Sequence, residues 1–190
     1  MTQKHGPWTI QETSQKYENS FINVREDQVL QPDGQPGMYA TVKMKPGVAI
    51  LPIDSDCPSG TGEANRVVYL TRQFRYALGK ESIEVVCGAL EEDEPPLEGA
   101  QREVQEELGI KAEEWIDLGV FDLDTSIVHC PVYLFLTKQL TFTQSHQEGT
   151  ETIETLRMPL DRAVQMVMDN EITHAPSCVL ILKAGNALSK

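Results

Sequence analysis

Three glutamates within a five-residue stretch are the part of this sequence best suited to chemistry. Glu103, Glu106 and Glu107 follow directly on Arg102, with only Val104 and Gln105 between them. An α-helix turns about 100° per residue, so a helix here places the three carboxylates in one narrow sector. Like charges so close repel one another unless a cation lies among them. Carboxylate oxygens suit hard divalent ions, so the pattern predicts a site for Mg²⁺ or Mn²⁺.

A solvated acidic helix face is the alternative, because most runs of charge are exposed. The surrounding segment favours the metal site, since it carries nine specified residue types at fixed spacing: Gly88, Glu94, Arg102, Glu103, Val104, Glu106, Glu107, Gly109 and Ile110. In all nine positions the segment resembles the signature of the Nudix hydrolases. The resemblance implies a loop–helix–loop that binds divalent metal and hydrolyses a nucleoside diphosphate linked to another group.

The residues around the glutamates predict the helix that presents them. Pro95 and Pro96 suit a helix start, where a missing N–H costs nothing, and Gly109 suits its end. An apolar stripe that can pack on a sheet is formed by Leu97, Ala100, Val104 and Leu108. We therefore expect a helix that is buried on one side and acidic on the adjoining side.

The remaining elements predict an α/β fold. Strands are expected at 48–53, 67–70, 118–123 and 132–137, and helices at 160–168 and 176–187, while 84–86 leads into the signature segment. The polar stretch 144–152 is expected to be a loop. The Gly-rich stretch 58–62 is expected to be a hairpin loop, because no Lys-Ser/Thr follows it as in a phosphate cradle. This order suits an α/β/α sandwich with a mixed sheet, which the Nudix resemblance also implies.

Residues 1–45 predict a separate N-terminal antiparallel β ribbon, followed by a Nudix domain at 46–190. Strands at 21–29 and 38–45 flank the turn cluster 31–37. A ribbon of two or three strands is marginal alone. It must therefore pack on the rest of the chain or on a partner subunit.

Further segments resemble the ADP-ribose pyrophosphatase and nucleotide-sugar hydrolase branch of the Nudix family. They are Trp8-Thr9, Tyr17-Glu18-Asn19, Val24 to Asp27, Pro32-Asp33-Gly34, Gln73-Phe74-Arg75 and Ser82-Ile83-Glu84. In that branch two subunits commonly exchange the N-terminal ribbon, and each site borrows residues from both. The resemblance thus implies a homodimer.

The same resemblance implies roles in substrate binding. Arg75 lies where the branch places an arginine that binds the diphosphate, and a guanidinium fork suits two phosphate oxygens; Arg72 has a weaker claim. Trp8 lies where an aromatic residue stacks on the nucleobase, and Tyr39 is a candidate for the opposite wall, from the same or the other subunit. The alternatives are a surface charge for each arginine and a packing anchor for Trp8.

The metal site implied by the resemblance consists of the carboxylates of Glu103, Glu106 and Glu107 with the backbone carbonyl of Cys87. Arg102 would orient a metal-binding carboxylate, with Glu84 as a candidate partner for Arg102. Glu151 resembles the late-loop glutamate that positions or deprotonates water, and Glu148 is the second candidate.

Departures from the branch widen the expected substrate range. The residues before Gly88 are Val85-Val86-Cys87, where the branch has proline and alanine. Thr125 and Ser126 occupy a region in which ADP-ribose enzymes often carry a proline. We therefore expect hydrolysis of nucleoside diphosphate sugars such as ADP-ribose or GDP-mannose. A non-catalytic nucleotide-sugar sensor and a hydrolase of dinucleoside polyphosphates or RNA caps are the alternatives.

The composition of the chain limits the binding partners and the cellular location that can be expected. The net charge of −13 over 190 residues argues against binding nucleic acid or anionic membranes. The four cysteines and four histidines are scattered, so neither a zinc site nor a disulfide framework is expected. The N-terminus has no apolar signal core, and no segment is long enough to span a bilayer. A cytoplasmic location is therefore expected.

Overall fold

The computed structural model describes residues 2–54, 66–145 and 152–188. The chain divides into two compact units. Unit 1 comprises Met1–Pro46 and Asp122–Pro131, and unit 2 comprises Gly47–Phe121 and Val132–Lys190. The first boundary lies close to the one expected, but the return of Asp122–Pro131 to unit 1 was not foreseen. The described helices include none long and apolar enough to cross a membrane.

Unit 1 is a sheet rather than a two- or three-stranded ribbon. Its five strands lie in the order β1 (Gln3–His5), β2 (Trp8–Glu18), β3 (Ile22–Leu30), β4 (Pro36–Met44) and β10 (Val128–His129). The first four pair antiparallel, whereas β10 runs parallel to β4. The sequence of β2 contains few apolar residues, so the alternation that betrays a strand is weak there.

The pairing of β3 with β4 determines which side chains of unit 1 share a face. Residues opposite each other in a sheet point to the same side. The register places Asn23 opposite Lys43, Arg25 opposite Thr41, and Asp27 opposite Tyr39. Alternate residues of both strands therefore form one polar and aromatic face.

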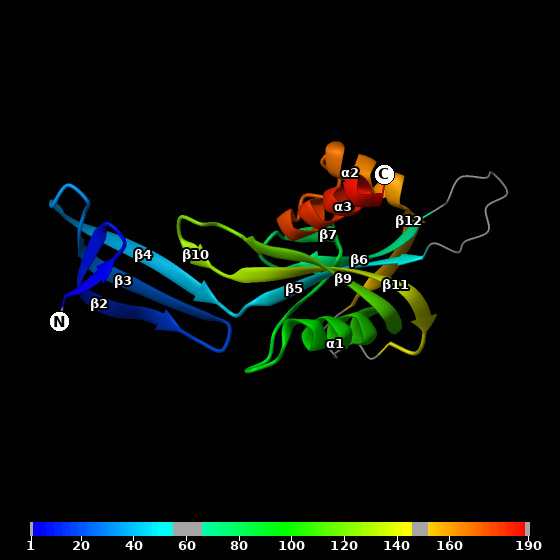
Figure 1. Ribbon diagram of the computed structural model, residues 1–190, viewed down its shortest axis with the longest axis horizontal. Helices are drawn as coiled ribbons and strands as arrows, with labels where there is room; N and C mark the ends of the chain where they lie inside the picture. Colours follow the sequence, from blue (N-terminus) through cyan, green and yellow to red (C-terminus); the bar gives the residue numbers. More distant parts are fainter. Residues whose placement is uncertain (1, 55–65, 146–151, 189–190) are drawn as a thin grey trace. The chain divides into compact units, whose positions relative to one another are not determined.

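Unit 2 contains a mixed seven-stranded sheet with helices on both sides. The main strand order is β12 (Glu154–Pro159), β6 (Val67–Arg75), β5 (Gly47–Asp54), β11 (Pro131–Phe142) and β9 (Ile110–Asp122); β7 (Lys80–Glu84) pairs with β6 and β8 (Val86–Ala89) with β5. Strand β11 is parallel to β5, whereas β6, β8 and β12 pair antiparallel. Helix α1 (Pro96–Leu108) covers one face, and α2 (Leu160–Met168) and α3 (Ala175–Leu188) cover the other (Figure 1). The α/β/α sandwich is confirmed.

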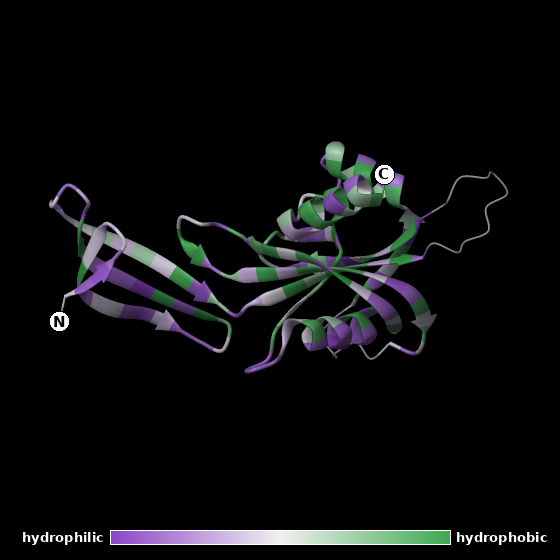
Figure 2. Cartoon of the chain, in the orientation of Figure 1, coloured by the Kyte–Doolittle hydropathy of each residue, from purple (hydrophilic) through white to green (hydrophobic). Residues whose placement is uncertain are grey.

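Helix α1 packs on the sheet through the expected stripe, with one exception. Ala100, Val104 and Leu108 are buried in a core with β5, β6 and β8, whereas Leu97 in the first turn is 40% exposed. Gly109 ends the helix in the left-handed conformation (φ 63°), and its N–H donates to Gln105. The helix is largely hydrophilic on its outer side, whereas the hydrophobic residues gather on the central strands and α3 (Figure 2).

Several elements extend beyond the ranges that the sequence predicted. Strand β6 continues from Leu70 to Arg75, β9 begins directly after α1 at Ile110, and β11 continues to Phe142. These extensions are more polar than the predicted segments, so hydrophobicity alone ended them too early. Helix α2 has the expected bounds, and α3 is longer by one residue at each end. The Gly-rich stretch 58–62 lies outside the described residues.

Candidate active site

The signature segment from Gly88 to Ile110, called the acidic box below, has Arg102 at the centre of its charged side chains. The Nε and Nη2 of Arg102 donate to the two carboxylate oxygens of Glu94, each at 2.9 Å. Its Nη1 donates to Glu103 at 2.8 Å and to Glu106 at 3.0 Å. These hydrogen bonds, that of Glu94 foremost, raise the pKa of Arg102, and the same guanidinium lowers the pKa of Glu94. A single cation thus offsets the repulsion that three nearby carboxylates create.

Gly88 in β8 lies next to Glu103, one of the carboxylates bound by Arg102. A Cβ atom built on Gly88 would overlap the carboxylate of Glu103. The glycine is therefore required by close approach between β8 and α1, which is a physical reason for its place in the signature. Glu103 has a side chain that is 13% exposed, and it is held between Gly88 and Arg102.

Glu107 is the most buried of the three candidate metal ligands. It is 5% exposed, whereas the side chain of Glu106 is 38% exposed. The Oε2 atom of Glu107 is buried and receives no hydrogen bond within the described residues. Its charge acts on the neighbouring Cys87 and Arg75: burial first, then Glu84 and Glu107, raise the pKa of the Cys87 thiol well above its usual value.

This set of oxygen atoms suits a hard divalent cation. Carboxylates on one helix face a strand whose glycine leaves room for close approach, and oxygen atoms are the ligands that such a cation prefers. Across residues 2–54, 66–145 and 152–188, however, no three acidic, thiol or imidazole side chains converge as a ready metal cage. Instead Glu103 and Glu106 turn to Arg102, and Glu107 points toward the buried side.

Arg75 and Glu84 form an ion pair in which the carboxylate is buried and the guanidinium is partly exposed, and this pair differs from the partner considered for Glu84 from the sequence. Arg75 donates through Nε at 3.1 Å and through Nη2 at 2.6 Å to the two oxygens of Glu84. Glu84 was a candidate partner for Arg102, but the described partners of Arg102 are Glu94, Glu103, Glu106 and the Ala89 carbonyl. Burial opposes ionisation of Glu84, yet the hydrogen bond from Arg75 and the charge of His174 keep its pKa below the usual value.

The positions of Arg75 and Glu84 on neighbouring strands explain why Glu84 contacts Arg75 and not Arg102. Arg75 and Glu84 lie on the neighbouring strands β6 and β7, whose register pairs Thr71 with Glu84 and Arg75 with Lys80. A long arginine side chain on β6 can reach back along its strand to Glu84. Arg72, which points elsewhere, pairs with the exposed Glu154 at 3.1 Å.

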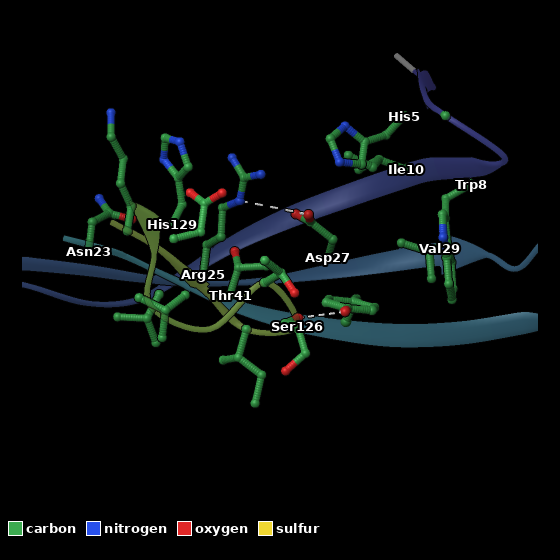
Figure 3. A pocket seen from close by; sticks show the side chains of 18 of the residues that line it. His5, Trp8, Ile10, Asn23, Arg25, Asp27, Val29, Thr41, Ser126 and His129 are labelled. Carbon is green, nitrogen blue, oxygen red and sulfur yellow. Dashed lines mark hydrogen bonds and ion pairs between the residues drawn. The ribbon is translucent and has the colours of Figure 1, made fainter. Parts of the chain in front are cut away.

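A cavity of about 800 Å³ lies within unit 1, on the face shared by β3 and β4 (Figure 3). Trp8 and Tyr39 both line it, with ring centroids 5.5 Å apart and ring planes 75° to each other. Within one chain they therefore form a single aromatic corner rather than two opposite walls. The Tyr39 hydroxyl donates to the Ser126 carbonyl at 2.6 Å, so the loop that carries Thr125 and Ser126 belongs to the same cavity.

The other end of this cavity is polar. Asn23, Arg25 and His129 lie there, away from Trp8 (Figure 3), and the strand register places Lys43 opposite Asn23 and His129. Asp27 lies between the two ends, 5% exposed, and accepts a hydrogen bond of 2.6 Å from Thr13. Arg25 is 3.7 Å from its other oxygen. The cavity thus offers an aromatic surface, a carboxylate and basic groups in that order.

Glu148 and Glu151 lie outside the described residues. His174 and Ser177, at the start of α3, contact the Arg75–Glu84 pair and the adjoining backbone. Sequence reasoning missed both, because a histidine and a serine distant in sequence from the box carry no spacing that links them to it.

Known proteins share both parts of this architecture. The Nudix domain model matches residues 45–177, more than half of the sequence, and the chain therefore belongs to the Nudix family. A second model, described as the nucleoside diphosphate sugar hydrolase N-terminal domain, matches residues 8–42. With the acidic box intact, the protein is a Nudix pyrophosphohydrolase, and Nudix enzymes generally use divalent cations.

Individual relatives are distant but align over most of their length. The methanol dehydrogenase activator of Bacillus methanolicus is 24% identical over 89% of this chain and 88% of its own. The ADP-ribose pyrophosphatase of Bacillus subtilis (strain 168) is 25% identical over 88% and 86%. A crystal structure titled as an ADP compounds hydrolase is 16% identical and superposes with a TM-score of 0.78 over 96% of this chain and 94% of that one. The last similarity shows the fold alone.

Proposed function

We propose that this protein hydrolyses the pyrophosphate bond of nucleoside diphosphate sugars, giving a nucleoside monophosphate and a sugar phosphate. The observation that carries the proposal is the complete acidic box in unit 2, with Glu103 fitted against Gly88. The similarity to an ADP-ribose pyrophosphatase makes ADP-ribose the first substrate to test, and GDP-mannose the second.

Glu103, Glu106, Glu107 and the Cys87 carbonyl would hold Mg²⁺, or Mn²⁺ in its place. A cation held there would supply a water of lowered pKa and would stabilise the negative charge that develops on the diphosphate. Arg102 orients Glu103 and Glu106, to which it already donates hydrogen bonds.

Arg75 would bind the diphosphate, and a glutamate of the late loop would activate water. Two of the five N–H groups of Arg75 are engaged by Glu84, and its side chain remains 35% exposed. The remaining N–H groups can therefore donate to phosphate oxygens. Glu151 would position or deprotonate the water, with Glu148 as the second candidate.

The cavity of unit 1 would hold the nucleoside. A base can pack on Trp8, whose π-face accepts any base, and Tyr39 supports this surface from the side. Asp27 can accept hydrogen bonds from ribose hydroxyls or from a base amino group, because its buried carboxylate lines the cavity.

We further propose a homodimer and a cytoplasmic location. Unit 1 exposes large hydrophobic side chains, with Phe21 67%, Met38 62% and Tyr17 54% accessible, and a partner subunit would cover such residues. Light scattering at micromolar concentration tests the dimer. The described cysteines, Cys87, Cys130 and Cys178, are all free, as suits a reducing compartment.

A substrate panel tests the function directly. Purified protein is incubated with nucleotide sugars and dinucleoside polyphosphates, Mg²⁺ and a phosphatase, and released phosphate is measured. Phosphate from ADP-ribose or GDP-mannose supports the proposal. Phosphate from dinucleoside polyphosphates alone, or from no substrate, would support the other hydrolase or the sensor instead.

Glu107→Gln tests the metal assignment within the same assay. We expect turnover to fall by at least about 100-fold, because the neutral amide is a poor ligand for a hard cation. Glu98→Gln is the matched control, since it makes the same change at an exposed position of the same helix. Near-wild-type turnover of Glu107→Gln would show that the assignment is wrong.

A further inference from the structure

In unit 2, outside the acidic box, four polar side chains are connected by hydrogen bonds and ion pairs. Arg75 ends β6, Glu84 ends β7, His174 immediately precedes α3, and Ser177 lies in the first turn of α3. Glu84 is 2% exposed and Ser177 is fully buried. The network includes none of the nine signature positions, so the signature does not explain it.

The chain changes its strand partner at Val85. Strand β7 pairs with β6 up to Glu84, and β8 pairs with β5 from Val86 onward. Val85 belongs to neither strand and is itself fully buried, so its N–H needs a partner outside the sheet. Ser177 supplies it: the Val85 N–H donates to the Ser177 Oγ at 2.9 Å.

His174 orients this hydroxyl. Its Nδ1 lies 2.8 Å from the Ser177 Oγ. The same Nδ1 lies 3.5 Å from Oε2 of Glu84, so the imidazole links the Ser177 hydroxyl to the Arg75–Glu84 pair.

The segment held by Ser177 connects two groups of the proposed site. One residue before Val85, Glu84 fixes the plane of the Arg75 guanidinium through two hydrogen bonds. Two residues after it, Cys87 presents the carbonyl assigned to the metal. A strand advances about 3.3 Å per residue, so a shift at Val85 moves both groups.

We propose that Ser177 is a positioning residue for the pyrophosphohydrolase site. By holding Val85, it fixes the Arg75 guanidinium and the Cys87 carbonyl at the separation that a metal-bound diphosphate requires. The inference rests on the roles of Arg75 and Cys87 in the proposed function. Ser177 itself touches neither metal nor substrate.

Ser177→Ala removes the acceptor and is compared with a buried hydroxyl elsewhere in unit 2. Thr137→Val is the matched control, because Thr137 is also fully buried and donates to the Glu114 carbonyl at 2.8 Å, outside the network. Mn²⁺ affinity is measured without substrate, from the electron paramagnetic resonance of free Mn²⁺. KM, kcat and the thermal midpoint are measured alongside it.

We expect Ser177→Ala to raise both the Mn²⁺ dissociation constant and KM by about three- to tenfold, the range one hydrogen bond covers, with kcat changed less. Thr137→Val should lower the thermal midpoint and leave both constants unchanged. Ser177→Cys keeps a side chain of similar size but accepts hydrogen bonds weakly, so it should raise the same two constants. If Ser177→Ala does not fold, Ser177→Cys provides the test.

Unchanged constants in a folded Ser177 variant, or an equal rise in Thr137→Val, would overturn the proposal. Failure of the proposed function looks different. In that case wild-type protein hydrolyses no nucleotide sugar, and the Mn²⁺ titration still compares Ser177→Ala with wild type. Wild-type protein that binds no Mn²⁺ would overturn the connection to Cys87.

Discussion

Arg75→Ala provides a quantitative test of the buried ion pair in unit 2. The substitution leaves Glu84, 2% exposed, without the guanidinium that donates both of its short hydrogen bonds. Only the weaker interactions with Ser82 and with His174, 3.5 Å away, remain, so the buried carboxylate must either stay charged with little compensation or take up a proton. Both outcomes stabilise the unfolded chain relative to the folded one.

The expected loss follows from the burial of the two partners. Removing one partner of a buried pair costs about 3–5 kcal/mol. The side chain of Arg75 is 35% exposed, so water reaches part of the vacated space, which reduces the estimate to about 2–3 kcal/mol. For a chain of this length that is a fall of roughly 5–10 °C in the thermal midpoint. Adding Glu84→Gln should recover the stability to within about 1 kcal/mol of the wild-type value.

The assay must report unit 2 alone, and the sequence allows this. The two tryptophans are Trp8 in unit 1 and Trp115 in unit 2, where Trp115 packs edge-on against Phe135. In a Trp8→Phe background, urea unfolding followed by Trp115 fluorescence therefore reports unit 2. Arg72→Ala is the matched control.

Arg72 lies on the same strand and pairs with the exposed Glu154. Its replacement should change the stability by less than about 0.5–1 kcal/mol. Equal unfolding midpoints for the Arg75 and Arg72 variants would refute the reasoning. So would a double variant with Glu84→Gln that is no more stable than Arg75→Ala.

Three further predictions concern the site and its pH dependence. Gly88→Ala should lower turnover by about 10- to 100-fold, because the new Cβ displaces the Glu103 carboxylate; a turnover assay at rising Mg²⁺ concentration should show partial recovery. Burial lowers the pKa of His174 from its usual 6.5, so the unfolded chain binds this proton more readily and stability falls as pH drops below 6.5. The urea midpoint of His174→Asn should depend less on pH between 7 and 5, and an equal slope would contradict this. Trp8→Ala should raise KM by about tenfold with kcat nearly unchanged, as loss of one stacked base predicts; an unchanged KM would exclude Trp8 from the base site.

Periodicity and spacing predicted the parts of the fold in which the physical signal is local. Helix α1 was predicted by its stripe and by its proline and glycine ends, and α2 by its helical spacing. The polar strand β2 and the two-residue strand β10 were not predicted. Their positions depend on pairing with distant strands, and no pattern within either segment records that pairing.

In the candidate site, too, the residues within one local segment could be predicted, whereas contacts between distant segments could not. The signature positions could be assigned because they lie in one continuous segment, from β8 through helix α1 to the start of β9. The partner of Glu84 was wrongly predicted, because a buried carboxylate takes the cation that the sheet register brings close, which is Arg75. Ser177 was missed because only the change of strand partner at Val85 creates a need for its hydroxyl.

Arg102 explains how so acidic a box is stable before any metal ion binds. From Glu91 to Glu107 eight residues are acidic and Arg102 alone is basic. Its guanidinium holds Glu103 and Glu106, so an entering cation competes with Arg102 for these two carboxylates. Glu107 is not among the described partners of Arg102 and is more buried than Glu106, so a cation would interact with it in a medium of lower dielectric. Glu107 should therefore contribute more to metal affinity than Glu106, which is why its replacement by glutamine is the most informative single substitution in the box.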